Sequence, residues 1–204
     1  MFEMTKPPDA ETVSTRVVTA LRSPGMIDQI VFARSELSSR ERPNVLGDCL
    51  PTGPDADTLQ PERFNFVPGA NGLCYAMPMS LGEAAPHPEK RDGWLVLFVA
   101  PENSVSTAVW RPVGWYEEAR LAGSYQRRPE PELRQYLYVV STQAKNAYVI
   151  PGDKRASFPV IASDHFTKRW TYARSPSHSG KWRERLAELA EQIVSRKSEC
   201  IRIG

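Results

Sequence analysis

The chain has 204 residues, the size of one substantial domain or of one domain with appendages. With 41% hydrophobic and 25% charged residues, it has enough apolar material for a core and is not compositionally disordered. No stretch approaches the roughly 18 to 20 apolar residues that span a bilayer, and the N-terminal segment lacks the pattern of a secretory signal. The three cysteines, Cys49, Cys74 and Cys200, form no CxxC pair, which excludes a disulfide scaffold and fits a reducing cytoplasm.

Charge is distributed unevenly, although the formal net charge is only +2. Residues 1–119 carry 10 Lys/Arg and 16 Asp/Glu, whereas residues 120–197 carry 15 Lys/Arg and 7 Asp/Glu. A basic half of this kind favours a polyanionic partner, most simply nucleic acid. Basic residues that merely decorate exposed helices and strands would give the same pattern, so both interpretations stay open here.

The N-terminal part predicts little regular structure. Residues 10–21 have apolar side chains at helical spacing before Pro24-Gly25, which predicts a short helix within an N-terminal tail of residues 1–28. Residues 30–33 predict a first strand. Residues 35–62 are polar and rich in Pro, Gly and Asp, which predicts a long loop.

Apolar and β-branched runs predict the strands that follow. The uninterrupted run over residues 94–100 is typical of a central strand, and the run over 107–122 contains Pro112-Val113-Gly114, which predicts a bulge or bend. The remaining strands are expected at residues 73–79, 135–141, 147–150 and 157–160.

The last segment predicts an amphipathic helix over residues 180–197, capped by Ser177 or Ser179. Its apolar stripe is expected to dock on a core and consists of Trp182, Leu186, Leu189, Ala190 and Ile193. Residues 29–204 therefore predict a single α+β domain, built as a twisted, closed or nearly closed sheet of five to seven strands with helices at its margins.

Catalytic motifs are scarce. His87, His165 and His178 stand in no zinc-ligand spacing, and no GxSxG, GxxxxGK[ST] or GxGxxG motif occurs. Asp164-His165 is the best acid–base pair, but a lone Asp-His step on a loop is more often incidental. Asp153-Lys154 fits a turn better than a metal site. The sequence therefore predicts no catalytic residue, no metal ligand and no cofactor.

Aromatic residues gather where the chain is basic, with 14 of the 19 between Trp94 and Trp182. Aromatic rings stack on nucleobases, at about 1 to 3 kcal/mol each, while Lys and Arg bind phosphates. The alternative is that these rings form the core of a sheet. Neighbours in a strand point to opposite faces, so at most one of Trp115 and Tyr116 lines a given pocket. The larger indole favours Trp115, with Tyr116 as core.

Four segments in succession form one pattern: ERFNF…GLCYAMP, WLVLFVAP, VGWYEEARLAG and YVIPGDKRASFPVI…TKRWTYAR. Over about residues 62–175, this pattern resembles the PUA-superfamily (EVE/YTH-like) modified-base-recognition domains found with bacterial HNH-type restriction endonucleases. The resemblance implies a PUA-like β-barrel with flanking helices, which flips a modified base into an aromatic cage. The sequence departs from the pattern before residue 62, has one residue more than a WY pair in Trp170-Thr171-Tyr172, and contains no HNH nuclease.

The resemblance implies a base-binding site, in which an Asn amide reads the base edge. Its residues would be Asn65, Phe66, Trp115, Tyr116, Arg155, Trp170 and Tyr172. The basic region separately predicts phosphate contacts by Arg127, Arg128, Lys168 and Arg169.

We therefore expect a cytoplasmic module that recognises nucleic acid, DNA rather than RNA, in a bacterial restriction or defence context, with a separate nuclease subunit or domain as a possible partner. Two alternatives stay open: a nuclease-like enzyme with a dispersed site, and a protein-interaction module that uses the C-terminal helix.

Overall fold

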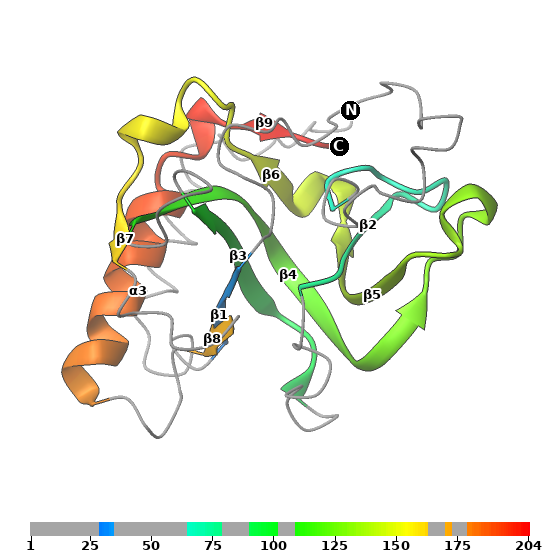
Figure 1. Cartoon of the computed structure of the whole chain (residues 1–204), viewed down its shortest axis with the longest axis horizontal. Helices are drawn as coiled ribbons and strands as arrows, with labels where there is room; N and C mark the ends of the chain where they lie inside the picture. The colour runs from blue at the N-terminus through cyan, green and yellow to red at the C-terminus, as the bar shows by residue number, and fades with distance from the viewer. Residues whose placement is uncertain (1–28, 35–64, 79–89, 102–108, 163–169, 173–178) are drawn as a thin grey trace, which may run out of the picture.

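The computed structural model describes residues 29–34, 65–78, 90–101, 109–162, 170–172 and 179–204. Within these residues the chain forms a nine-stranded sheet and one α-helix, α3 (Gly180–Val194), as Figure 1 shows. The fold is α+β and rich in β-structure, as the sequence predicts. In the described part of the chain, no helix has both the length and the apolar character that a membrane crossing needs.

Strand β4 (Val109–Arg127) organises the sheet, because its 19 residues pair with four other strands. The main path of the sheet is β2-β5-β4-β3-β1-β8, with β6 and β7 also paired to β4 and β9 paired to β6. Strand β1 runs parallel to β3, and the other pairs are antiparallel. The remaining strands are β1 (Ile30–Arg34), β2 (Leu73–Ala76), β3 (Trp94–Pro101), β5 (Leu137–Gln143), β6 (Ala147–Val149), β7 (Ile161–Ala162), β8 (Trp170–Tyr172) and β9 (Ile201–Arg202).

Two irregularities bend β4 along its length. Gly114 lies opposite Phe98 but Pro112 lies opposite Val99, so Val113 is an extra residue and the predicted bulge is confirmed. A second register shift follows at Glu117 and Glu118, where Glu118 has a φ of 48°. Figure 1 shows the result: β4 runs from β7 and β3 on one side of the molecule to β5 on the other.

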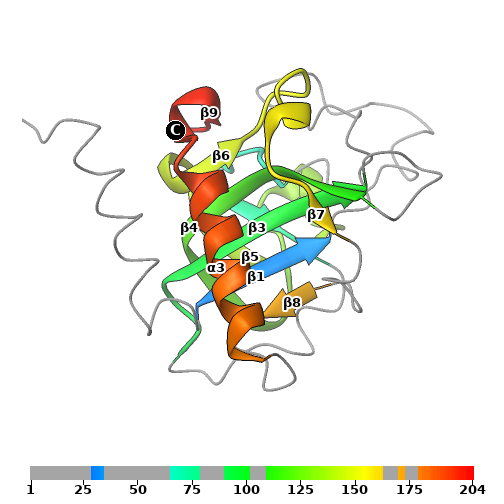
Figure 2. The same cartoon turned by 90° about the vertical axis from the view of Figure 1, so that its left-hand side faces the viewer.

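The bent sheet separates two apolar clusters. The first cluster lies between the sheet and α3, which crosses β1, β3 and β4 in Figure 2. Leu186, Leu189, Ala190 and Ile193 of α3 are buried in it, and Trp182 packs against it. The predicted docking of the helix is therefore confirmed. Because the apolar stripe is covered within the chain, it does not form an exposed surface for a partner.

The second cluster lies on the opposite face, where the distal half of β4 folds over with β5 and β2. It combines residues from β1 and β3 with Phe66, Cys74, Tyr116, Leu121 and Val140. This curvature encloses an interior on one side of the sheet. Strands β2 and β8 end the path without pairing to each other in the described residues, so closure into a barrel is not seen there.

One predicted strand needs correction, and two predicted elements lie outside the described residues. Residues 157–160 were expected as a strand, but the 3-10 helix η7 (Arg155–Ser157) precedes β7 instead. Backbone hydrogen bonds from Ser157 to Lys154 and from Phe158 to Arg155 close this turn, and Pro159 has no N–H for a ladder. The expected helix at residues 10–21 and the loop at residues 35–62 lie outside the described residues.

Candidate nucleic-acid interface

Trp115 and Tyr116 point to opposite faces of β4, as strand alternation requires, and both are fully buried. The indole of Trp115 stacks on Tyr148 in the cluster under α3, with ring centroids 5.1 Å apart and an interplanar angle of 16°. The expectation that Trp115 is an open pocket wall is therefore corrected, because its ring is part of the core. Tyr116 is also buried, as expected, but on the face that carries Phe66.

Hydrogen bonds next to Trp115 connect β4 to the segment that follows α3. Its Nε1 donates to Glu117 Oε1 at 3.2 Å, and Lys197 Nζ donates to Glu117 Oε2 at 2.7 Å. The same ammonium lies 4.3 Å from the centroid of the Tyr148 ring. Burial on its own would lower the pKa of Lys197, but the interactions of the ammonium with Glu117 and Tyr148 together raise that pKa. These contacts attach the segment after α3 to β4 and β6.

The structure brings Phe66 and Tyr116 together and places Asn65 beside them in the chain. Phe66 packs edge-to-face on Phe98 and on Tyr116, with both centroid distances at 5.5 Å. Asn65 is only 3% exposed, which is unusual for an amide side chain. Gly114 leaves room for this packing, because a Cβ there would lie 2.6 Å from Phe66 Cζ. Phe66 thus meets Gly114 and Tyr116 of the GWY segment on one face of β4.

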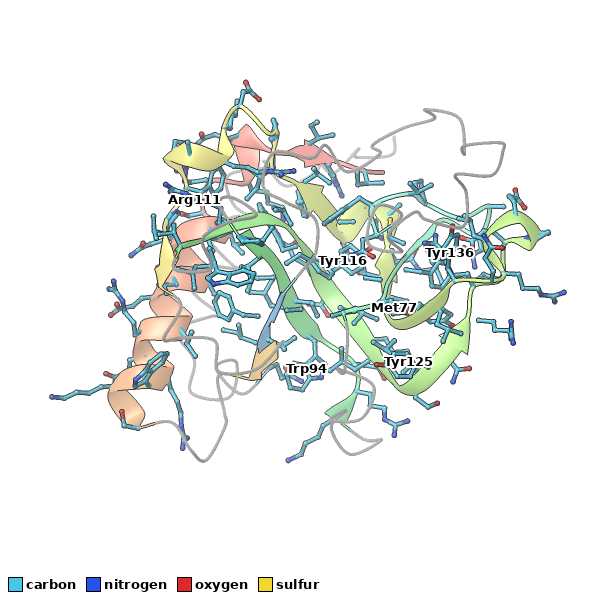
Figure 3. All side chains as sticks on the ribbon, viewed as in Figure 1. Met77, Trp94, Arg111, Tyr116, Tyr125 and Tyr136 are labelled. Atoms are coloured by element: carbon cyan, nitrogen blue, oxygen red, sulfur yellow. The ribbon has the colours of Figure 1, made fainter. Side chains whose placement is uncertain are left out.

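This interior contains polar atoms whose hydrogen-bonding capacity is unusual for a core. The hydroxyl of Tyr116, labelled in the middle of the molecule in Figure 3, is buried and has no hydrogen-bond partner among the residues that the structure describes. Burial raises its pKa well above the ordinary tyrosine value, and Cys74 adds to the rise while Arg128 opposes it. Burial also raises the pKa of the Cys74 thiol to about 12. Both groups are therefore neutral at physiological pH.

Arg128 does not lie on the surface, which argues against its expected phosphate contact. Its side chain is 2% exposed and forms an ion pair with Glu130 at 3.3 Å. Its Nη2 also donates to the carbonyl oxygen of Val67 at 3.3 Å, and its guanidinium lies 5.3 Å from the centroid of the Tyr75 ring. Arg127, by contrast, is exposed.

Arg155 and the Trp170–Tyr172 strand lie apart from the Phe66–Tyr116 contact. Arg155 is buried in the turn of η7, where its Nε donates to the carbonyl oxygen of Ile150 at 3.2 Å, and burial lowers its pKa to about 10. Strand β8 pairs with β1, so β1 and β3 separate it from β4. Lys168 and Arg169 lie outside the described residues, as does Asp164-His165.

The hairpin formed by β4 and β5 (residues 120–143, called the β4–β5 hairpin below) presents aromatic and basic side chains to solvent. Tyr125 is 37% exposed and Leu137 is 36% exposed, and the register places Leu137 opposite Arg127. Arg134 is exposed and Tyr136 is partly exposed. Figure 3 shows Tyr125 and Tyr136 on this limb of the molecule. Sequence reasoning missed Tyr125, Arg134 and Tyr136, although the alternation in YQRR and RQYLY is a signal that identifies them.

Among the described residues, no group of three or more His, Cys, Asp or Glu side chains is arranged to hold a metal ion. The geometry instead combines exposed tyrosine and arginine side chains on the hairpin with a buried interior that contains Phe66, Tyr116 and Cys74, while Asn65, next to Phe66 in the chain, is also buried. No family model, curated protein or solved structure matches this chain.

Proposed function

We propose that this protein is a nucleic-acid-binding recognition module of PUA-like fold, which reads a modified base in DNA in a bacterial restriction or defence context. The observation that carries the proposal is the set of side chains on the β4–β5 hairpin in which Tyr125, Arg127 and Arg134 are exposed and Tyr136 is partly exposed. Cleavage would come from a separate nuclease subunit or domain.

The hairpin has the chemistry of a nucleic-acid surface. Exposed guanidinium groups bind phosphates in a salt-dependent manner, and tyrosine rings provide a face for base stacking. Arg127 and Arg134 supply such cations, while Tyr125 and Tyr136 supply the rings. The net charge of residues 120–197, with 15 Lys/Arg and 7 Asp/Glu, adds a long-range attraction for phosphate.

Base recognition is assigned to the interior on the Phe66 face of β4. An extruded base needs aromatic contact and hydrogen-bonding groups that read its edge. Phe66 and Tyr116 supply the rings, and the amide of the buried Asn65 is both donor and acceptor. The Tyr116 hydroxyl has no hydrogen-bond partner in the described part of the chain. The sharp curvature of β4 around this interior is what a nearly closed, PUA-like barrel requires.

The phosphate part of the proposal is tested by salt titration of oligonucleotide binding. We expect the Arg127→Met and Arg134→Met variants each to reduce the slope of log K against log[salt] by about 0.9 for duplex DNA. Arg185→Met is the matched control, because Arg185 is an exposed arginine on α3, away from the hairpin. A wild-type protein that binds no oligonucleotide at low salt contradicts the function itself.

The base-reading part is tested with Tyr116→Phe, which removes the hydroxyl and keeps the ring. We expect the variant to fold and to retain salt-dependent binding, but to lose discrimination between modified and unmodified bases in an oligonucleotide panel. Trp115→Phe, on the opposite face, is the control and should retain discrimination. Discrimination that survives in Tyr116→Phe contradicts this reading of the interior, and metal-dependent cleavage by the isolated protein would favour the nuclease-like alternative.

A further inference from the structure

We propose that Arg128 is a positioning residue of the nucleic-acid interface: with Glu130 it forms a latch that holds the β4–β5 hairpin against the turn before β2. This inference rests on the proposed function, since it concerns how the same hairpin is presented to nucleic acid. In this role the charges of Arg128 and Glu130 neutralise each other, so that Arg128 does not contribute to phosphate binding.

The latch joins two segments that are far apart in the sequence. The guanidinium of Arg128 contacts both carboxylate oxygens of Glu130, with Nε–Oε2 and Nη2–Oε1 distances of 3.3 Å, and also reaches the Val67 carbonyl oxygen at 3.3 Å. The Glu130 carboxylate in turn lies against Gly69, where it fills the space that a Cβ would occupy. The pair therefore binds the backbone of residues 67–69 to the end of β4.

The latch also contacts Tyr75 of β2, whose ring packs on Tyr138 of the hairpin. Arg128 lies 5.3 Å from the centroid of the Tyr75 ring, and that ring packs on Tyr138 at a centroid distance of 4.6 Å. The Tyr75 hydroxyl accepts a hydrogen bond of 2.6 Å from Asn71 Nδ2. The backbone N–H of Arg128 donates to the Tyr136 carbonyl oxygen at 3.1 Å, which fixes the two strands at the base of the turn. Loss of the guanidinium would loosen all of these contacts together.

Burial decides against a direct phosphate contact. The Arg128 and Glu130 side chains are 2% and 12% exposed, so their charges neutralise each other inside the protein. A phosphate would have to displace the carboxylate to reach the guanidinium. The exposed neighbour Arg127 needs no such displacement, which makes it the matched comparison.

The two roles predict opposite effects of removing Glu130. If Arg128 contacts phosphate, Glu130→Gln removes a nearby negative charge and increases affinity, and Arg128→Met lowers the salt slope by about 0.9. If the pair is a latch, each substitution lowers affinity by a similar factor and leaves the slope unchanged, because the phosphate contacts are made by other arginines. The double variant should then bind no more weakly than either single variant, since both remove one interaction.

The experiment measures binding of the full chain to a fluorescein-labelled duplex between about 50 and 200 mM KCl, where counterion release is well resolved. We expect Arg128→Met and Glu130→Gln to lose about 5- to 30-fold in affinity, the range of one disrupted interaction of one to two kcal/mol. Arg127→Met should instead show the reduced slope. A reduced slope in Arg128→Met, or tighter binding by Glu130→Gln, overturns the inference.

Hydrogen exchange of the free protein provides a readout that does not depend on nucleic acid. We expect both latch variants to exchange backbone amides of residues 125–138 faster than wild type, with β3 unchanged. Unchanged exchange in the hairpin overturns the latch. If the wild-type protein binds no nucleic acid but both variants still exchange faster in the hairpin, the proposed function is overturned and the latch remains.

Discussion

Gly114 shows how a single residue determines the packing of the interior. It lies in β4 opposite Phe98 and Val149, at a position where the Phe66 ring and the Tyr148 carbonyl oxygen approach the backbone. Any Cβ at residue 114 would push Phe66 away from Tyr116, and these two rings are in edge-to-face contact. The glycine is therefore required by close packing and not by a left-handed backbone, because its φ is not positive.

We expect Gly114→Ala to lower the free energy of unfolding by about 1 to 3 kcal/mol, the cost of overpacking a filled core. Gly152→Ala is the matched control, because a Cβ at residue 152 meets no atom within 4 Å. Urea unfolding followed by tryptophan fluorescence gives both values. A Gly114→Ala variant as stable as the control would show that Phe66 moves aside at no cost.

For single residues, the sequence predicts which neighbouring side chains point to opposite faces of a strand, but not what covers each face. It places Trp115 and Tyr116 on opposite faces, which the structure confirms, but it contains no information on which face α3 covers. Arg127 and Arg128 likewise look equivalent in the sequence. They differ in the structure because only Arg128 lies within reach of Glu130 and of the Val67 backbone.

Local signals predict the elements where packing and propensity agree. The apolar run at Trp94–Pro101, the bulge at Val113 and the amphipathic stripe of α3 all follow from residue patterns within one segment. The prediction is wrong at residues 157–160, where aromatic and β-branched residues favour a strand but backbone hydrogen bonds of a 3-10 turn prevail. Strand β9 has only two residues, too few to carry a periodicity.

The helix α3 gives the sharpest test of an element. Leu186 is fully buried against the sheet, so Leu186→Ala should lower the free energy of unfolding by about 2 to 5 kcal/mol. Glu188→Ala is the control on the exposed side of the same helix, where an i,i+3 ion pair at 3.7 Å contributes little, and its effect should stay within about 0.5 kcal/mol. Chemical denaturation measures both. Equal, small effects would mean that the helix is not anchored by its apolar stripe.

For the whole molecule, the order of strands is the feature that sequence reasoning could not supply. The parallel pairing of β1 with β3 joins residues about 65 positions apart, and no local pattern specifies such a partner. The bent β4 then serves both apolar clusters, since Trp115 belongs to one and Tyr116 to the other. Strain or expansion on one side of the sheet is therefore expected to affect the other side through the same strand.

A buried thiol and a partly buried thiol, on the two sides of the sheet, make the stability of the molecule sensitive to alkaline pH. Cys74 lies in the second cluster and Cys200 packs against the first, and burial raises the pKa of each thiol from 9.0 to about 12. Above pH 9 the unfolded chain releases these protons while the native protein retains them. The native state then binds more protons, so the free energy of unfolding falls as pH rises from 9 towards 12.

We expect this fall to be visible between pH 9 and 10, with a slope from Cys74 that approaches about 1.4 kcal/mol per pH unit. Tyrosines with an ordinary pKa near 10 also begin to ionise in this range, so the contribution of each thiol is the difference in slope between wild type and the cysteine variant. Cys74→Ala should be less stable than wild type at pH 7 because it leaves a small void, yet it should lose less stability between pH 9 and 10. Cys200→Ala should reduce the slope in the same direction from the other side of the sheet. Urea unfolding at several pH values measures these slopes, and a slope that is the same in wild type and in both variants would show that the thiols are not buried as described.

One unfolding transition, with the same midpoint by circular dichroism and by tryptophan fluorescence at each pH, is expected because β4 couples the two clusters.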